Sequence, residues 1–388
     1  MAFPFSLRRR IAEIRRVSHI MEVLVRNGLG FLVSLLALDR FLPRFWRRPQ
    51  VRTDASAARR TLPQRLRHTL EELGGTYVKL GQFLSGRADL LPPAYIEELA
   101  KLLDAAPPVA ASEIRAVIED ELEAPIETVF YSFEDVPIAS ASIGQVHRAR
   151  LAGGQDVVVK VQRPGLQEMV DTDLDLFLRQ ARFLERRSET MRDYNLVAIT
   201  QELIRSIREE LDYQIEGHNA ERLRNNLAAD GRFVVPHVFW GLTTRRIITL
   251  EYIDGIKLNE LRRLQEAGYD LTTIAQVTVE GYLKQVFVDG VYHADPHPAN
   301  IMVVGDQIGF LDFGNVGHLT PGQKEQLGDM FLQILDEDAG GVARTVVKMG
   351  ATRGRPDLEA MERDLQRLLI RYWGVALEEL PVGEMLAE

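Results

Sequence analysis

The chain has 388 residues, 46% of them hydrophobic and 27% charged, which is enough for one large domain or for two lobes. It has no cysteine, which excludes disulfide bonds and thiolate metal sites and is typical of a reducing compartment. The net charge of −9 is unevenly distributed, because residues 1–60 hold 13 arginines and no lysine against 4 acidic residues. The rest of the chain is therefore strongly acidic, which argues against nucleic-acid binding.

Residues 1–48 form a basic arm in which arginines alternate with Phe, Leu, Val and Trp46. Its longest uncharged run, Asn27 to Leu38, is shorter than the about 20 apolar residues that a membrane span needs. The arm is predicted either to lie as amphipathic helices on an anionic membrane surface or to pack on the body of the protein. A cleaved organelle-targeting peptide fits the composition less well. We expect a cytoplasmic protein that is peripheral at the inner face of the membrane.

The next elements are helical and then change to strands. A polar linker near 48–62 precedes three helical segments that Pro92-Pro93 and Pro107-Pro108 divide, with Ser112 as the predicted cap of the third. From Val129 the β-branched runs VFYSFEDV, IGQVHRARL and DVVVKVQ predict an antiparallel meander. Two long helical patterns and two strand-like runs follow: 166–188, 196–227, FVVPHVFWGL and RRIITLEYI.

After Gly255 the sequence is mostly helical. A helix is predicted over 273–290, and HADPHPAN (293–300) is predicted to be a loop because its two prolines forbid a regular helix. A hairpin is predicted over 301–313. This order predicts an α+β, two-lobed, protein-kinase-like fold, divided into an arm, a helical extension, an N-terminal lobe and a C-terminal lobe: 1–48, 49–128, 129–254 and 255–388.

Lys160 and the preceding strand connection are the first candidate site. The segment ASASIGQV follows the pattern AxAxxGxV of a phosphate loop, with alanine at the first two glycine positions. Taken alone, a turn of small residues is the better interpretation of this loop. If the match holds, Val146 packs on the base and Lys160 reaches the α/β-phosphates. We expect these residues to line the nucleotide: Ile138, Ala139, Ser140, Ala141, Ser142, Ile143, Gly144, Gln145, Val146, Lys160, Glu251 and Ile253.

A buried lysine needs a carboxylate partner. The helix around REELDYQIEGHNAERL offers Glu210, Asp212 and Glu216, of which Asp212 and Glu216 are four residues apart and would share a helix face. Kinases pair the strand lysine with a glutamate of the following helix. We therefore predict an ion pair between Lys160 and Glu216.

HADPHPAN has the spacing HxDxxxxN of a kinase catalytic loop. Asp295 is predicted to accept the proton of an attacking hydroxyl, and Asn300 to bind a metal ion. Asp312, in a DFG motif on the second strand of the hairpin, is predicted to hold Mg²⁺. Each motif arises often by chance, but the ordered set in its expected structural context does not.

Two departures from protein kinases constrain the substrate. Thr320 is predicted to cap a helix soon after Gly314, which leaves no room for the activation segment on which a peptide docks. His297 stands where protein kinases commonly have a lysine, and its charge depends on pH.

The chain resembles the UbiB-type (AarF-domain) family of atypical kinases over roughly residues 75–350. The family's KxGQ motif appears as Lys79-Leu80-Gly81-Gln82 and its ExD motif as Glu210-Leu211-Asp212, beside the alanine-rich loop, VVVKVQRPG and HADPHPAN. The resemblance implies a kinase-like fold that binds ATP or ADP with Mg²⁺, with the KxGQ helix across the cleft. It also implies membrane association and a role in ubiquinone or other prenyl-lipid biosynthesis. Many relatives continue into C-terminal transmembrane helices, so we expect either that such a segment is missing after Glu388 or that the protein is anchored only by its basic arm.

Three glycines near Lys79 weaken a helix by about 1 kcal/mol each, a cost that close packing would justify. We expect Lys79 and Gln82 to dock on Glu210 and Asp212 as a regulatory contact, the alternative being an exposed lysine. Three functions stay open. They are a phosphotransferase or ATPase of a membrane lipid pathway, a nucleotide-regulated scaffold for lipid-biosynthesis enzymes or quinone precursors, and a small-molecule or lipid kinase.

Overall fold

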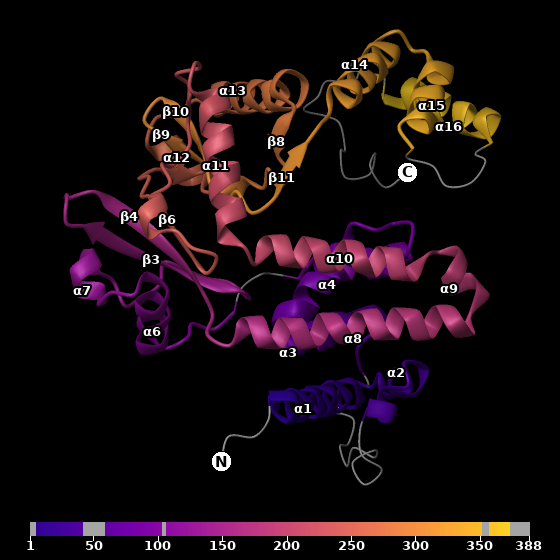
Figure 1. Cartoon of the computed structure of the whole chain (residues 1–388). Coiled ribbons are helices and arrows are strands. Elements are labelled where there is room, and N and C mark those ends of the chain that lie inside the picture. The colour runs from indigo at the N-terminus through magenta and orange to yellow at the C-terminus, as the bar shows by residue number, and fades with distance from the viewer. Residues whose placement is uncertain (1–4, 42–58, 103–105, 351–356, 373–388) are drawn as a thin grey trace. The chain divides into compact units, whose positions relative to one another are not determined.

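A computed structural model describes residues 5–41, 59–102, 106–350 and 357–372 (Figure 1). Trp46 and most of the linker predicted near 48–62 lie outside these residues. The chain divides into two compact units, the first made of Met1–His218 and His237–Tyr252, the second of Asn219–Pro236 and Ile253–Glu388.

The first unit combines helices with an antiparallel sheet. Its helices before the sheet are α1 (Phe5–Arg26), α2 (Gly30–Leu35), η1 (Leu38–Phe41), α3 (Leu62–Leu73), α4 (Gly75–Ser85), α5 (Pro93–Leu99), α6 (Ala111–Leu122) and α7 (Ile126–Val129). Its strands are β1 (Phe130–Phe133), β2 (Ala139–Ser140), β3 (Gly144–Leu151), β4 (Asp156–Gln162) and β6 (Ile247–Glu251). Its later helices are α8 (Leu166–Arg187), α9 (Glu189–Asp193), α10 (Leu196–Glu210), the first part of α11 (Tyr213–Leu227) and η4 (Trp240–Leu242).

The sheet has the order β1-β3-β4-β6, and β2 also pairs with β3. Every pairing in it is antiparallel, as the β-branched runs predict. Because successive side chains of a strand point to opposite faces, Val157, Val159 and Val161 lie on one face of β4. They pack there against Ile114 and Ile118 of α6. The other face is left for Lys160 and its neighbours.

The arm packs on the helical extension, one of the two arrangements that the sequence leaves open. Val17, Met21 and Leu24 of α1 belong to the same buried cluster as Leu70 and Leu176. This side of α1 is therefore part of the core of the first unit. No helix among the described residues has the length and apolar character needed to cross a bilayer.

Two local predictions in the first unit are wrong. Helix α6 begins at Ala111 with Ala110 at the cap position, so Ser112 lies inside the first turn and caps nothing. The pattern over 196–227 is not one helix, because α10 ends at Glu210 and α11 begins at Tyr213. Two long-range bonds hold the break: Gln162 Nε2 donates to the carbonyl of Leu211, and Tyr213 N donates to the carbonyl of Arg245.

The second unit contains two small sheets and several helices. Its elements after α11 are β5 (Phe233–Val234), β7 (Ile256–Lys257), α12 (Leu261–Glu266), α13 (Leu271–Leu283), the π-helix η5 (Lys284–Asp289), β8 (Val291–His293), η6 (Pro298–Asn300), β9 (Ile301–Val304), β10 (Gln307–Phe310), β11 (Val316–His318), α14 (Pro321–Leu335), α15 (Ala339–Lys348) and α16 (Leu358–Tyr372). One sheet has the order β5-β10-β9-β7, and β8 pairs with β11 in the other.

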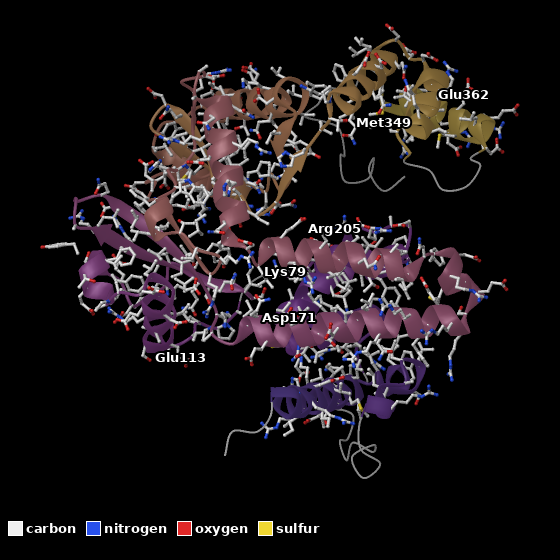
Figure 2. All side chains as sticks on the ribbon, in the orientation of Figure 1. Lys79, Glu113, Asp171, Arg205, Met349 and Glu362 are labelled. Atoms are coloured by element: carbon white, nitrogen blue, oxygen red, sulfur yellow. The ribbon has the colours of Figure 1, made fainter. Side chains whose placement is uncertain are left out.

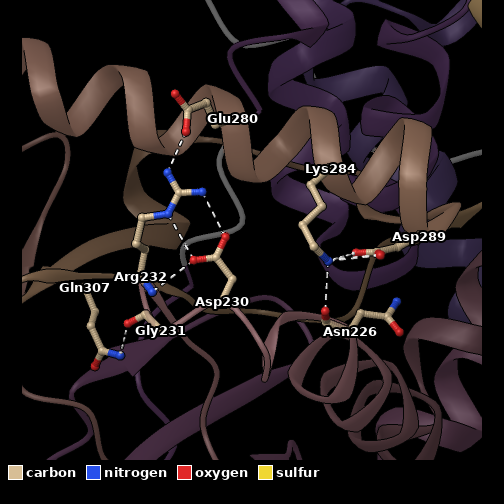
Figure 3. A network of polar contacts seen from close by, with 8 residues as sticks. All are labelled: Asn226, Asp230, Gly231, Arg232, Glu280, Lys284, Asp289 and Gln307. Carbon is tan, nitrogen blue, oxygen red and sulfur yellow. Dashed lines mark hydrogen bonds and ion pairs between the residues drawn. The ribbon is translucent and has the colours of Figure 1, made fainter.

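Residues 219–236, which the sequence analysis assigns to the N-terminal lobe, belong to the second unit. Figure 3 shows the polar contacts responsible. Arg232 donates to Asp230 at 2.9 Å and to Glu280 of α13 at 2.5 Å, and Lys284 Nζ donates to the carbonyl of Asn226 at 2.9 Å. Strand β5 also pairs in parallel with β10. The contacts with Glu280, Lys284 and β10 join segments far apart in sequence, so no local pattern reveals them.

The hairpin predicted over 301–313 is present as β9 and β10, whose turn residues Gly305 and Asp306 separate the paired Val304 and Gln307. The region after Gly255 is mostly helical, as predicted, but it also contains the short strands β7, β8 and β11, which the prediction does not include. Each has only two or three residues, which is too short for an alternating pattern to show in the sequence. The strand-like run FVVPHVFWGL is likewise a strand only over β5.

Candidate functional site

In the first unit, Lys160 and Glu216 form the predicted ion pair. Lys160 Nζ lies 2.9 Å from each carboxylate oxygen of Glu216, whose side chain is 5% exposed. The ammonium also lies over the ring of Tyr213, 5.1 Å from its centre. Directly paired strand residues share a face, so Val146, which pairs with Lys160, stands beside it on the face opposite α6. Val158 lies on this face too, one pleat along β4.

The geometry of the ExD motif differs from the prediction. Asp212 and Glu216 do not share a helix face, because α11 begins only at Tyr213. Asp212 instead accepts a hydrogen bond from Gln214 N at 3.2 Å and pairs with Arg245 at 3.2 Å. Asp212 therefore stabilises the start of the helix that carries Glu216.

The alanine-rich loop is a tight turn. Ala139 and Ser140 pair with β3, and Ala141 N donates to the carbonyl of Gly144 at 2.8 Å. Gly144 has no space for a side chain, because a Cβ atom there would lie 2.8 Å from the carbonyl oxygen of Val161. A larger residue would therefore push the loop away from the sheet.

Arg163 holds this loop in place through hydrogen bonds, a role that the motifs in the sequence do not predict. Its guanidinium donates to the carbonyls of Ala141 and Pro107 at 2.8 Å and to Ser140 Oγ at 3.0 Å. Arg163 lies within VVVKVQRPG, so membership of a family motif is the signal that could have identified it. The alanine loop is thus fixed by hydrogen bonds from an arginine.

Two residues predicted to line the nucleotide point elsewhere. Ile143 is 6% exposed and packs in a helical core with Leu166 and Leu203. Gln145 is fully buried on the α6 face, where its Nε2 donates to His147 Nε2 at 3.2 Å. The position of Gln145 follows from strand alternation, which allows only every second residue of β3 to face the ligand side. Ile143 lies in the bend just before β3 and packs against the helices instead.

His147 completes this buried group. Its Nδ1 donates to the carbonyl of Glu134 at 2.8 Å, and its ring stacks on Phe133. Burial lowers the pKa of His147, and the hydrogen bond to Glu134 partly offsets that effect. His147 is therefore a neutral structural residue of the sheet.

Three further residues predicted to line the nucleotide, Ile138, Glu251 and Ile253, lie at or just beyond the ends of strands. Ile138 is 53% exposed, and its N–H donates to the carbonyl of Val146 at 2.8 Å. The carboxylate of Glu251 accepts from His237 N at 3.1 Å. Ile253 is the first residue of the second unit after β6. The chain therefore crosses from one unit to the other beside Glu251, where the sequence analysis expects the nucleotide.

The KxGQ helix docks on the ExD motif through one residue. Lys79 of α4, which Figure 2 labels, forms an ion pair with Glu210 of α10, and its side chain is only 12% exposed. Gln82 does not take part as predicted, since its Nε2 donates to the carbonyl of Leu102 at 3.4 Å. At the neighbouring Gly81, a Cβ atom would lie 2.9 Å from Leu70 Cδ1, so α4 packs tightly on its neighbours.

The other two glycines near Lys79 have a different role from the one predicted. Gly74 and Gly75, with φ of +69° and +34°, lie at the junction of α3 and α4, where Gly74 caps both helices and Gly75 is the first residue of α4, so neither is in a helix interior. Positive φ values favour glycine because it has no Cβ atom. These glycines therefore form the turn that starts the KxGQ helix.

In the second unit, His293 organises the loop HADPHPAN. The ring is fully buried, its Nε2 lies 2.8 Å from the carbonyl of Leu311, and its Nδ1 accepts from Asp295 N at 3.2 Å. A carbonyl can only accept and an amide N–H can only donate, so the ring is the neutral Nε2–H tautomer. His293 thus connects the loop to the strand before Asp312.

The loop brings Asp295 and Asn300 into contact. Asn300 Nδ2 donates to Asp295 Oδ2 at 3.1 Å. Because this bond uses the nitrogen of the amide, the other amide atom, Oδ1, is an oxygen that suits a hard cation. Among the described residues no three His, Cys, Asp or Glu side chains gather as a preformed metal cluster. Mg²⁺ does not require one, since it binds one or two protein oxygens together with phosphate oxygens.

His297 and Asp312 both lie where the backbone changes direction, His297 at the start of η6 and Asp312 at a positive φ. His297 Nδ1 accepts from Ala299 N at 3.1 Å and so caps η6, which makes it a turn-forming residue. Asp312 has a φ of +58°, and the carbonyl of the following Phe313 accepts from Asn219 Nδ2 of α11 at 3.1 Å. Asn219 is a further site residue that the motifs do not reveal.

The segment after Gly314 is as short as predicted. Strand β11 follows at Val316, and Thr320 then caps α14 in a capping box with Gln323. Thr320 Oγ1 accepts from Gln323 N at 3.3 Å, and Gln323 Oε1 accepts from Thr320 N at 2.9 Å. This part of the chain therefore contains no segment of the kind on which protein kinases bind peptides.

Comparison with known protein families shows which family has this arrangement of motifs. The sequence model of the ABC1 atypical kinase-like domain matches residues 101–346, more than half of the chain. The chain belongs to this family. The predicted UbiB-type resemblance and the kinase-like fold are thereby confirmed.

Individual relatives agree with this assignment. The chain is 34% identical to the "Probable protein kinase UbiB" of Shewanella halifaxensis, over 97% of this chain and 69% of that protein. It is 38% identical to the "Protein ACTIVITY OF BC1 COMPLEX KINASE 7, chloroplastic" of Arabidopsis thaliana, over 80% of this chain and 45% of that protein. The chain spans about half the length of several curated relatives, 56% and 54% in two further cases.

A solved structure is also similar. The complex of Rv3197 with erythromycin from Mycobacterium tuberculosis matches with a TM-score of 0.56 at 31% identity. The match covers 78% of this chain and 77% of that one.

Proposed function

We propose that the protein binds ATP or ADP with Mg²⁺ and transfers a phosphoryl group to water or to a small or lipid hydroxyl. The observation that carries the proposal is the Lys160–Glu216 pair, with both distances at 2.9 Å and the carboxylate buried. Kinases need this pair to hold the α/β-phosphates. A merely solvent-exposed lysine would not be kept in place by a buried carboxylate on a separate helix.

The second unit offers oxygen donors of the type that the chemistry needs. Asn300 and Asp312 would hold Mg²⁺, which would neutralise the negative charge of the nucleotide phosphates. Asp295, oriented by the hydrogen bond from Asn300, would accept the proton of the attacking hydroxyl.

Several features favour a small or lipid acceptor over a peptide. The chain reaches α14 directly after β11, and the KxGQ helix is anchored by the Lys79–Glu210 ion pair. We propose a role in ubiquinone or other prenyl-lipid biosynthesis, which rests on the UbiB-type resemblance. A nucleotide-regulated scaffold in a lipid-biosynthesis complex is the alternative if no turnover is measured.

We also propose a peripheral position at the cytoplasmic side of an anionic membrane. Helix α2 presents Phe31 and Leu35 to solvent at 58% and 57% exposure, and α1 presents Arg10 and Arg15. Exposed apolar and arginine side chains together are what an anionic interface binds. The buried side of α1 does not take part.

Thermal unfolding with and without Mg²⁺ tests the nucleotide site. ADP at a hundredfold excess over its Kd should stabilise the protein by about 2.7 kcal/mol, and only with the metal present. Asp312→Asn should remove the metal-dependent part. Asp306→Asn, the same exchange at an exposed position of the β9–β10 turn, is the matched control and should behave as the wild type. An undiminished metal response in Asp312→Asn would show that Asp312 is no ligand.

A further inference from the structure

The π-helix η5 presents one polar residue, Gln285, to the catalytic loop. We propose that Gln285 is a positioning residue for Asp295, an inference that rests on the proposed phosphoryl transfer. Gln285 belongs to none of the motifs that the sequence analysis recognises. Its role follows from one contact and from the way that contact is held.

The contact links η5 to the first residue of HADPHPAN. Gln285 is fully buried, and its Oε1 accepts a hydrogen bond from the backbone N of His293 at 3.0 Å. The ring of His293 in turn accepts from the backbone of Asp295 and donates to Leu311, the residue before Asp312. One side-chain amide therefore holds a histidine whose own hydrogen bonds reach the backbone of Asp295 and the residue before Asp312.

The orientation of this amide is determined by its partner. The N–H of His293 requires an acceptor, so the oxygen of Gln285 must face it and Nε2 must point away. Nε2 is buried and has no hydrogen-bond partner among the described residues. A buried donor without a partner costs free energy, which methionine of similar size would avoid. The fold thus keeps a polar side chain at this buried position, and the hydrogen bond that its amide makes is the one that holds His293.

A carboxylate would accept the same hydrogen bond. It would also place a charge at a fully buried position, which is far more costly than burying a neutral amide. Glutamine therefore suits this position, because its amide oxygen accepts the hydrogen bond from His293 without carrying a charge.

The π-helix itself is held at both ends. At its start, Lys284 Nζ donates to Asp289 at 2.8 Å and to the carbonyl of Asn226 at 2.9 Å (Figure 3). At its end, Gly290 has a φ of +67°, and a Cβ atom there would lie 3.0 Å from the carbonyl oxygen of Leu319. π-Helical turns occur frequently at functional sites. Here the turn sets the position of Gln285 relative to β8.

The test compares two substitutions at Gln285 with a matched one elsewhere in the same unit. Gln285→Met removes the acceptor at similar volume, and Gln285→Asn withdraws the amide by one methylene group. Gln333→Met removes the partner of Thr345 Oγ1, a half-buried hydrogen bond of 2.9 Å outside the loop. ATP turnover is measured well below each melting temperature, and the Kd of ADP with Mg²⁺ is measured by calorimetry.

We expect both Gln285 variants to lose turnover by about tenfold or more, since a small displacement of a catalytic group has effects of up to about 10². Their ADP affinity should stay within about twofold of the wild type. Gln333→Met should lower the melting temperature without lowering turnover. Unchanged turnover in both Gln285 variants, or a parallel loss of turnover and ADP affinity, would overturn the proposal.

A second measurement does not depend on activity. In ¹⁵N-histidine NMR spectra, His293 of the wild-type protein should show the Nε2–H tautomer with Nδ1 accepting. Gln285→Met should change this signal, whereas Gln333→Met should not. A wild type without turnover but with the expected His293 response would contradict the proposed function and leave the positioning role standing. An identical His293 signal in all variants would contradict the positioning role itself.

Discussion

At the scale of single residues, the loop HADPHPAN depends on side chains that hold one another. Asn300 donates to Asp295, and the backbone N of Asp295 donates to the ring of His293. The carboxylate is thus oriented from two sides before any ligand binds. Preorganisation of this kind serves the chemical step more than the binding of the nucleotide.

The first prediction concerns Asp295. As a general base it should contribute about 10²–10⁴-fold to turnover, because Asn at this position cannot accept the proton. Asp295→Asn should therefore lose turnover by that factor and keep the Kd of ADP with Mg²⁺. Steady-state hydrolysis and calorimetry measure the two quantities. If hydrolysis were unaffected, the scaffold function would become the better explanation.

At the scale of secondary-structure elements, two helix contacts can be tested by stability. The KxGQ helix α4 meets α10 through Lys79 and Glu210, and α1 meets α8 through Arg16 and Asp173. Figure 1 shows α8 and α10 running side by side, so both contacts fasten to the same helical pair. The two ion pairs differ in burial, and this sets the expected size of each effect.

For the KxGQ helix we predict coupling in a double-mutant cycle. Lys79→Ala and Glu210→Ala should be non-additive by about 0.5–3 kcal/mol in the free energy of unfolding, as contacting residues are. Denaturant titration of the four proteins measures this. A second cycle with Lys79→Ala and Gln82→Ala should be closer to additive, because Gln82 bonds to Leu102. Additivity in the first cycle would mean that Lys79 is only a surface lysine.

For the arm we predict that removing the side chain of Arg16 greatly lowers the free energy of unfolding. Arg16 donates to both carboxylate oxygens of Asp173 at 2.7 Å, and the side chain of Asp173 is fully buried. Arg16→Ala would leave a buried charge without its partner, which costs about 3–5 kcal/mol. Arg15→Ala, at an exposed arginine next to it, is the control and should change the free energy of unfolding little. Equal effects of the two substitutions would contradict the anchoring role of Arg16.

At the scale of the whole molecule, the arm determines how the protein could meet a membrane. Its apolar side belongs to the core of the first unit, so deleting the arm would expose that core and give an ambiguous result. The informative residues are the exposed ones, Phe31 and Leu35 of α2. These can be changed without altering the packed side of α1.

We predict that Phe31→Ser with Leu35→Ser lowers binding to vesicles that contain anionic lipid. Wild-type binding should also weaken with salt, since charge attraction is screened over about 8 Å at physiological ionic strength. Vesicle sedimentation measures both effects. Ile370→Ser, at a 68% exposed apolar residue of α16, is the matched control. Equal sedimentation of the double variant and the wild type would contradict a membrane role for α2.

Much of the site could be predicted from the sequence because its parts are local. The two prolines of HADPHPAN exclude a helix, and the spacing of Asp295 and Asn300 within one short loop allows their side chains to meet. The capping box of Thr320 and the hairpin turn at Gly305 are likewise written in neighbouring residues. Such features depend on backbone preferences and on hydrogen bonds across a few residues, which the order of amino acids specifies directly.

Only the tertiary structure decided the features that depend on distant contacts. In the folded chain Gln145 points to the buried α6 face of the sheet, Gln82 bonds to Leu102, and Gln285 bonds to His293. The tertiary structure also buries one side of α1, although the composition of the arm suits a membrane surface equally well. An apolar or polar side chain carries no information about which distant surface will cover it, because that choice depends on the packing of the whole chain.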